Sequence, residues 1–280
     1  MSPGRVSTPA IFRSGQPLVF AHRGGAKLAP ENTIPAFDNG IAQCADGVEL
    51  DVQLSADGVP VVIHDKTLDR TTNLTGPVHA LTVDELARVD AGYAFERDGA
   101  HPFRGQGIGV PTLEAVLRRH PATRLIIEMK GGEPELAGEV ARVVRRVGAL
   151  DRICVGSFYQ TAIDALRLES PDIVTSASQE EARWTLHRSW VRWPWTGPRP
   201  YVAFQVPERV GRMRVVSRNF IRQVHREGQV LQIWVVDSAA DATRLFDWGV
   251  DGLITDRPDV TVPARDAWQA QARITKNERR

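Results

Sequence analysis

Residues 48–64, VELDVQLSADGVPVVIH, contain two apolar runs, Val48–Leu54 and Val59–His64, separated only by the four residues SADG. Parallel neighbouring strands need a crossover of a dozen or more residues, so a linker this short predicts an antiparallel pair. The stretch therefore predicts a β-hairpin whose first strand carries acidic side chains.

Outside the return strand of this hairpin, short Val- and Ile-rich runs alternate with helical patterns. The eight runs are Leu18–His22, Val48–Leu54, Leu125–Lys130, Ile153–Phe158, Ile173–Ala177, Tyr201–Val206, Val230–Val236 and Leu253–Thr255. Each is almost continuously apolar, as expected for a parallel strand covered on both faces. Because eight parallel strands close a barrel, we expect an α/β fold, a (β/α)8 TIM barrel with a β-hairpin after strand 2.

Residue signals mark several expected helix ends. An apolar stripe from Leu136 to Val147 stops at Gly148, and glycine commonly ends helices. Ser178 and Glu181 have the spacing of a capping box at a helix start.

The expected barrel domain covers residues 17–260, with polar segments at both ends. Residues 1–16 predict a flexible lead-in, and residues 261–280, which end in KNERR, predict a frayed tail. Residues 66–110 interrupt the alternation with a short capped helix, Thr82–Val89, and a glycine-rich run, which predicts a small insertion after the hairpin.

Composition is that of a soluble globular protein. The 280 residues are 42% hydrophobic and 25% charged, which excludes a disordered or collagen-like chain. Lys and Arg number 35 against 34 Asp and Glu, so a net charge of +1 offers no long-range attraction to nucleic acid, and we expect no nucleic-acid partner.

Compartment signals point to the cytoplasm. The N-terminal residues lack the apolar core of a secretory signal, and no run of 18 apolar residues occurs, so we expect a cytoplasmic protein. Cys44 and Cys154 are not spaced as a zinc site and are expected to be buried free thiols.

Acidic side chains share one face of two expected neighbouring strands. Glu49 and Asp51 are two residues apart, so they point to the same side, and Glu128 repeats the pattern on the next parallel strand. Carboxylates that converge in an apolar setting repel one another and lose hydration, and a divalent cation relieves both costs. All-oxygen ligation favours Mg²⁺ or Ca²⁺.

The hairpin returns a histidine to these carboxylates. With the turn centred near Asp57, His64 lies opposite Leu50 or Asp51. Taken singly, a strand-end histidine, a Glu-x-Asp pair or Lys130 is typical of an ordinary structural role. Together, polar residues at the ends of adjacent barrel strands indicate an active site.

Six motifs occur in order along the chain. They are His22-Arg23-Gly24, Pro30-Glu31-Asn32-Thr33, Glu49-x-Asp51, Val61-Val62-Ile63-His64-Asp65, Glu128-x-Lys130 and Asp251-Gly252-Leu253-Ile254-Thr255-Asp256-Arg257-Pro258. From about Leu18 to Asp259 the chain resembles the glycerophosphodiester phosphodiesterase family, a group of TIM barrels related to phosphatidylinositol phospholipase C. Segment 66–110 resembles the insertion that distinguishes the two groups.

The resemblance implies three sets of site residues: ligands of one divalent cation, a general acid–base pair, and cations that bind phosphate. In that order they are Glu49, Asp51 and Glu128, then His22 and His64, then Arg23 and Lys130. The resemblance also implies that Trp234 lines the glycerol pocket. Asp237 stands where the family often has Asn, which puts the polar contacts at that position in question.

Supporting residues are expected behind this site. From the residues themselves, Asn32 or Thr33 can cap the first helix, and Glu31 can orient His22 or Arg23. Glu31 and Asn32 are expected to support the site together with Asp65.

The implied activity is metal-dependent hydrolysis of glycerophosphodiesters to glycerol 3-phosphate and an alcohol. Two alternatives remain open: a lysophospholipase D that acts on lysophospholipids, and a barrel that binds a ligand without catalysis. The expected partner is a small-molecule substrate.

Residues 180–200, EEARWTLHRSWVRWPWTGPRP, hold four tryptophans, Trp184, Trp190, Trp193 and Trp195, among several arginines. One interpretation is a peripheral membrane contact, since Trp favours the membrane interface and Arg favours anionic headgroups. The other is a helix that packs its Trp side chains on the barrel and exposes its Arg side chains.

Overall fold

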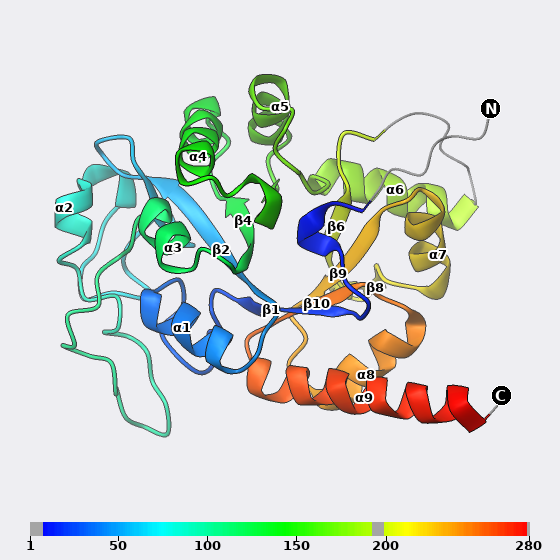
Figure 1. Ribbon diagram of the computed structural model, residues 1–280. Coiled ribbons are helices and arrows are strands. Elements are labelled where there is room, and N and C mark those ends of the chain that lie inside the picture. The colour runs from blue at the N-terminus through cyan, green and yellow to red at the C-terminus, as the bar shows by residue number, and fades with distance from the viewer. Residues whose placement is uncertain (1–7, 192–198, 279–280) are drawn as a thin grey trace.

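The computed structural model describes residues 8–191 and 199–278, which form an α/β fold around one curled sheet (Figure 1). Seven parallel strands lie in the order β5-β4-β2-β1-β10-β9-β6. Their bounds are β1 Leu18–His22, β2 Gly47–Leu54, β4 Arg124–Met129, β5 Ile153–Ser157, β6 Ala203–Pro207, β9 Val230–Trp234 and β10 Gly252–Thr255. These seven agree with the expected runs to within a residue or two.

The expected strand at Ile173–Ala177 is wrong as a regular strand. This segment lies between the two edges of the sheet and makes isolated parallel bridges, Thr175 with Val155 of β5 and Ser176 with Ala203 of β6. Its backbone makes a few hydrogen bonds to β5 and a few to the residues around the start of β6, so it forms a continuous ladder with neither. The observed sheet is therefore a curled sheet of seven parallel strands rather than a barrel of eight.

A short strand, β3 Pro60–Val62, pairs antiparallel with the end of β2. The register sets Val52 opposite Val62, and the Ile63 amide donates to the Asp51 carbonyl at 3.0 Å. His64 therefore comes level with Leu50 and Asp51, as the turn position predicted.

Helices surround the sheet on its outer side (Figure 1). They are α1 Ile34–Ala42, α3 Leu113–Arg119, α4 Pro134–Val147, α5 Gln160–Glu169, α6 Gln179–Val191, α7 Arg218–Arg226, α8 Ala239–Trp248 and α9 Pro258–Glu278, whereas α2 Val83–Leu86 lies in the insertion. The apolar stripe of α4 is buried against the sheet, and the helix ends at Gly148 in the left-handed conformation, as predicted. Ser178 and Glu181 make the expected reciprocal hydrogen bonds at the start of α6.

Both expected chain ends are more ordered than their composition indicated. In the lead-in, Ile11 and Phe12 form the 3-10 turn η1 Ala10–Phe12 and are buried, with the Phe12 ring edge-on to Phe20 at 6.5 Å. Residues 1–7 of the lead-in lie outside the described residues. A few buried apolar side chains are therefore enough to anchor this polar segment.

The described residues of the expected frayed tail, 261–278, form part of α9, and residues 279–280 lie outside the described residues. Thr261, Val262 and Arg265 are buried, and Trp268 Nε1 donates to Asp247 Oδ1 of α8 at 2.9 Å. The tail is polar in composition but amphipathic in spacing, so one face of α9 packs against α8 and β1.

The insertion at residues 66–110 packs Leu68, Leu86 and Val110 into a small apolar cluster together with Val61 of β3. Its helix α2 begins with the predicted capping box but spans only Val83–Leu86. It also holds the 3-10 turn η2 Val78–Ala80.

One cysteine prediction is wrong. Cys154 is a buried free thiol in β5, whereas Cys44 follows the end of α1 and is exposed. Cys44 adopts a left-handed backbone conformation, with φ of 61°, in the turn that leaves the helix.

Helix α6 contradicts the packing interpretation for two tryptophans and one arginine, although Arg183 is exposed as that interpretation expects. Trp184 and Trp190 are each 58% exposed, whereas Arg188 is buried. Trp193 and Trp195 lie outside the described residues. Within the described part of the chain, no helix combines the length and apolar character needed to cross a bilayer.

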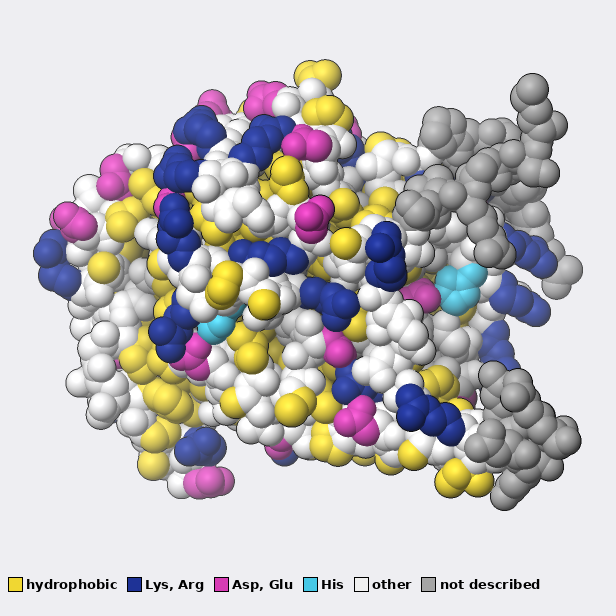
Figure 2. Space-filling model, in the orientation of Figure 1, with side chains coloured by type: hydrophobic (Ala, Val, Ile, Leu, Met, Phe, Trp, Pro, Cys, Tyr) yellow, Lys and Arg dark blue, Asp and Glu magenta, His cyan; other side chains and the backbone are white. Residues whose placement is uncertain are grey.

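Surface charge is mixed in sign. On the face shown in Figure 2, basic and acidic side chains are interspersed with hydrophobic ones. This intermixing agrees with the net charge of +1.

A buried ion cluster joins α6, β6 and α7. The Glu227 carboxylate at the end of α7 pairs with Arg188 of α6 and with Arg199 before β6, and all three side chains are less than 10% exposed. Removing one partner from a buried cluster leaves charges less compensated, which costs about 3–5 kcal/mol.

We therefore predict that Glu227→Ala lowers the free energy of unfolding by about 3 kcal/mol or more in urea denaturation. Exposed Glu96→Ala serves as the control and should change it by less than about 0.5 kcal/mol. An equal, small effect of both substitutions would contradict a structural role for the cluster.

Candidate active site

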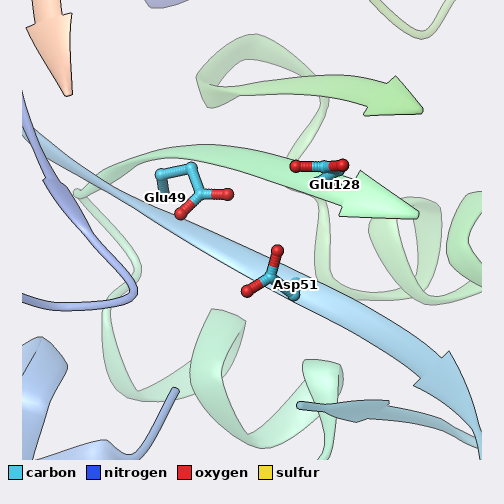
Figure 3. Close-up of side chains that lie close together, drawn as sticks. All are labelled: Glu49, Asp51 and Glu128. Atoms are coloured by element: carbon cyan, nitrogen blue, oxygen red, sulfur yellow. The ribbon is translucent and has the colours of Figure 1, made fainter. Parts of the chain in front are cut away.

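Three carboxylates from the neighbouring strands β2 and β4 converge (Figure 3). Glu49 and Asp51 lie two residues apart on β2, and the parallel register places Asp51 beside Glu128 of β4. One oxygen from each of the three lies within 4.8 Å of the others. The sheet therefore brings together the three acidic residues that the sequence analysis selected.

Crowding and burial separate the pKa values of these carboxyls. Burial, together with the Asp51 charge, raises the pKa of Glu49 to about 7. Burial also raises the pKa of Glu128. For Asp51 burial acts in the same direction, but the Lys130 and Arg23 cations outweigh it, so its pKa is lowered.

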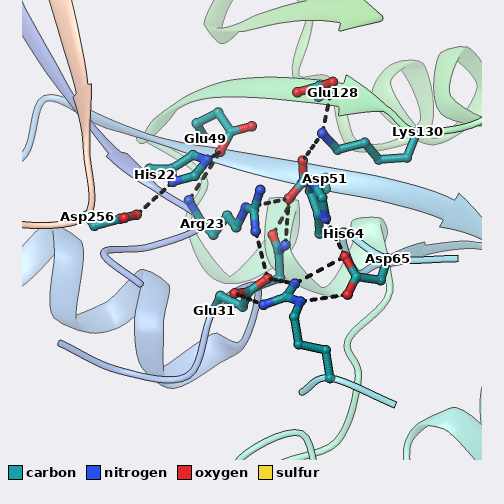
Figure 4. Close-up of polar contacts among 12 residues, drawn as sticks. His22, Arg23, Glu31, Glu49, Asp51, His64, Asp65, Glu128, Lys130 and Asp256 are labelled. Carbon is teal, nitrogen blue, oxygen red and sulfur yellow. Dashed lines mark hydrogen bonds and ion pairs between the residues drawn. The ribbon is translucent and has the colours of Figure 1, made fainter. Parts of the chain in front are cut away.

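Two cations lie among the carboxylates (Figure 4). Lys130 Nζ is 3.0 Å from Asp51 and 2.9 Å from Glu128. Arg23 Nε is 3.0 Å from Asp51, and the Arg23 backbone amide donates to Glu49 at 3.2 Å. Arg23 also takes a left-handed backbone conformation, with φ of 51°.

The glycine after Arg23 is sterically required. Gly24 has φ of 87°, and a Cβ there would lie 2.5 Å from the Ala36 backbone of α1. The His-Arg-Gly motif thus depends on close packing of the β1 loop against the first helix.

The donor set fits a hard divalent cation. The three side chains offer only oxygen atoms, and Glu49 and Asp51 are at least 96% buried. Asp51 Oδ1 and Glu128 Oε1 are buried, and both face the same cationic group, Lys130 Nζ, at 3.0 and 2.9 Å. Such oxygens are suited to ligate a cation.

Two histidines flank the carboxylates in matching arrangements. His22 Nδ1 donates to Asp256 at 2.7 Å, and His64 Nδ1 donates to Asp65 at 2.5 Å. Each aspartate orients a ring and leaves Nε2 available, and His22 Nε2 lies 3.8 Å from Glu49.

The pKa values of the two rings shift in opposite directions. Burial disfavours the charged form of His22, but the hydrogen bond to Asp256 and the Glu49 charge outweigh burial and raise its pKa. Burial lowers the pKa of His64, helped by the Lys130 and Arg23 charges.

The expected supporting residues take partly different roles. Asn32 donates to Asp51 Oδ2 at 2.8 Å and accepts from the Asp51 amide at 3.2 Å, which holds the carboxylate in place. Thr33, rather than Asn32, caps α1. Glu31 forms an ion pair with Arg23 at 2.9 Å. The carboxylate that orients His22 is that of Asp256, not that of Glu31.

Sequence reasoning missed two residues of this network, Asp256 and Arg70. Asp256 stood in the last motif, directly after β10, where its strand-end position was a usable signal. Arg70 stood in the insertion, and no periodic pattern marked it. Arg70 and His64 both donate to Asp65; although burial opposes them, they lower the pKa of Asp65 to about 2.

A cavity of about 410 Å³ opens beside these groups. Both histidines, Arg23 and Lys130 line its polar part, and Trp234 lines its apolar part. The Trp234 ring meets Phe158 edge-on at 6.2 Å.

Asp237 does not line this cavity among the described lining residues. It accepts a hydrogen bond from the Asp256 amide at 2.8 Å and pairs with Lys27 at 2.8 Å. The departure from Asn therefore falls on a residue that holds the Asp256 loop.

Comparison with known proteins identifies the family of this chain. The sequence pattern of the glycerophosphoryl diester phosphodiesterase family matches residues 22–260. The chain therefore belongs to this family and is a glycerophosphodiester phosphodiesterase.

Curated relatives and solved structures cover almost the whole chain. A glycerophosphodiester phosphodiesterase of Caldanaerobacter subterraneus is 32% identical over 250 residues, 88% of this chain and 96% of the relative. The fold is similar to the glycerophosphodiester phosphodiesterase of Agrobacterium tumefaciens, with a TM-score of 0.70 and 31% identity over 88% of this chain and 99% of that one. It is also similar to the phosphodiesterase domain of Rv2277c from Mycobacterium tuberculosis, with a TM-score of 0.76 and 26% identity over 91% and 99% of the two chains.

The Asp256–His22 contact predicts a pH-dependent stability. A histidine whose pKa is raised on folding stabilises the fold below its unfolded value near 6.5, and this contribution is lost as pH rises through the folded value. Asp256→Asn should therefore destabilise the protein more at pH 5.5 than at pH 8.5, measured by urea unfolding in EDTA. Exposed Asp98→Asn is the control, and an equal loss at both pH values would contradict the effect.

Proposed function

We propose that this chain hydrolyses glycerophosphodiesters to glycerol 3-phosphate and an alcohol. Its cofactor is one Mg²⁺ or Ca²⁺ held by Glu49, Asp51 and Glu128. One geometric observation carries the proposal: two buried carboxylates and one half-buried carboxylate have oxygens within 4.8 Å of one another, and two histidines, each hydrogen-bonded to an aspartate, flank them.

The metal proposal follows from charge. Three carboxylates lie close together beside the two cations Lys130 and Arg23, and burial together with the Asp51 charge raises the pKa of Glu49. A bound divalent cation would supply further positive charge and polarise the non-bridging oxygens of the substrate phosphate.

Phosphate binding falls to Arg23 and Lys130. Both cations line the cavity, and the carboxylates that flank them keep them charged. As negative charge builds on the phosphoryl oxygens in the transition state, these preorganised cations stabilise it.

Proton transfer falls to the two histidines. The lowered pKa of His64 favours its neutral form, which suits a base that takes the proton of the attacking hydroxyl. The raised pKa of His22 favours the protonated form, which suits an acid that protonates the departing oxygen.

Hydrolysis proceeds by one or two displacement steps at phosphorus. Water attacks phosphorus directly, or a glycerol hydroxyl attacks first, the bond to the other alcohol breaks, and water then opens the cyclic phosphate with the proton roles exchanged. Both routes end at glycerol 3-phosphate and use the same two rings.

The substrate class follows from the relatives, which are named for glycerophosphodiesters. Those names do not favour the lysophospholipid alternative, and membership of an enzyme family disfavours a non-catalytic barrel. Contact of α6 with a membrane remains a prediction, as does the cytoplasmic location.

We predict that His22→Ala and His64→Ala each lower kcat at least ~100-fold, because each removes a proton-transfer group. Glycerol 3-phosphate release from glycerophosphoethanolamine measures the rate, and calorimetry should give nearly unchanged Mg²⁺ affinity. His79→Ala, an exposed histidine of the insertion, is the control. Either ring variant that kept more than about a tenth of kcat would exclude that ring from the acid–base pair.

We predict that Asp51→Asn raises the Mg²⁺ or Ca²⁺ concentration needed for half-maximal activity at least ~10-fold, because it removes a charged ligand. Activity that EDTA abolishes and added cation restores should accompany this shift in the wild-type chain. Full activity in EDTA would contradict the metal proposal. Asp98→Asn controls for loss of a surface charge.

A further inference from the structure

We propose that Arg70 is a positioning residue that holds His64 and Arg23 in their working geometry, so that the insertion 66–110 takes part in the site. The inference rests on the proposed function, since it assigns Arg70 through residues to which that function gives roles. No chemistry passes through Arg70 itself.

The Arg70 guanidinium donates hydrogen bonds to two carboxylates, those of Glu31 and Asp65. Its Nη1 and Nη2 donate to the two Glu31 oxygens, both at 2.7 Å. Its Nε donates to Asp65 Oδ2 at 2.6 Å, and Nη2 also reaches Asp65 Oδ1 at 3.2 Å. Every nitrogen of the guanidinium is thus engaged in one plane.

Each of these two carboxylates also accepts a hydrogen bond from a residue of the active site (Figure 4). Glu31 Oε1, which accepts from Arg70, also accepts from Arg23 Nη1 at 2.9 Å. Asp65 Oδ1, which accepts from Arg70, also accepts from His64 Nδ1 at 2.5 Å. One side chain therefore sets the partner of a phosphate-binding cation and the partner of an imidazole.

Arginine suits this task better than lysine. A planar fork meets two carboxylates in fixed directions, whereas an ammonium is a compact point charge. An exposed ion pair contributes little to stability. Because the Arg70 side chain is 48% exposed, we assign the network to positioning rather than to holding the fold.

The insertion backbone around Arg70 is itself anchored. Leu68 is fully buried in the apolar cluster of the insertion, and its carbonyl accepts from the Thr72 hydroxyl at 2.9 Å. The Leu68 amide donates to the Gly76 carbonyl at 3.0 Å. These contacts fix the turn that presents Arg70 to the site.

The test compares Arg70→Ala, Arg70→Lys and the control Arg88→Ala, an exposed arginine of the same insertion. With glycerophosphoethanolamine, we expect Arg70→Ala to lower kcat about 10- to 100-fold. Added guanidinium chloride should restore part of that loss when matched NaCl does not. Arg70→Lys should have a lower kcat than Arg70→Ala has in the presence of guanidinium. Arg88→Ala should have the wild-type kcat with and without guanidinium.

A second readout does not depend on turnover. Nitrogen-15 NMR of the His64 ring should report one fixed tautomer in the wild-type chain and averaging in Arg70→Ala. A fall in kcat with no guanidinium rescue and an unchanged His64 signal would overturn the inference, as would full activity of Arg70→Ala. If Arg70→Ala failed to fold, Arg70→Lys would carry the same comparisons.

The proposed function and this inference fail differently. An inactive wild-type chain with Mg²⁺ or Ca²⁺ contradicts the function, and the His64 tautomer then still decides whether Arg70 positions the ring. An active wild-type chain with an unaffected Arg70→Ala contradicts the positioning role alone.

Discussion

The arrangement of the site depends on one electrostatic constraint, the repulsion among three carboxylates in a buried space. Glu49, Asp51 and Glu128 cannot all be charged there without cations beside them. Lys130 and Arg23 supply part of that charge, and the remaining deficit is what a divalent cation would fill. A bound phosphodiester is anionic, so it would add further negative charge that the same cations must compensate. Substrate, metal and cationic side chains are therefore coupled through one set of oxygens.

The fold satisfies this constraint through register. Parallel pairing of β2 with β4 places Asp51 beside Glu128, and the antiparallel return through β3 brings His64 to the same level. Three residues of the site each have a further carboxylate partner: Asp256 for His22, Asp65 for His64, and Glu31 for Arg23. Arg70 joins two of these pairs, so the insertion and the barrel share one network.

Sequence reasoning succeeded where a local rule governed the outcome. The short linker after β2 predicted the antiparallel return, and the two-residue spacing predicted that Glu49 and Asp51 share a face. It failed where packing decided. The segment at Ile173–Ala177 is apolar enough for a strand, yet it divides its hydrogen bonds between two sheet edges. The tail is polar enough to fray, yet one face of α9 is buried.

The sequence by itself determined the alternation of strands and helices, the facing of the acidic residues and the family, because periodicity and motif spacing are local properties of the chain. Only the tertiary structure decided the hydrogen-bond partners, which are Asp256 for His22, and Arg70 for Glu31 and Asp65. It also decided that the side chains of Trp184 and Cys44 are exposed to solvent. Asp256 lies 234 residues from His22, and no local pattern encodes a contact across that separation. Such pairings arise when the curled sheet sets β1 beside β10.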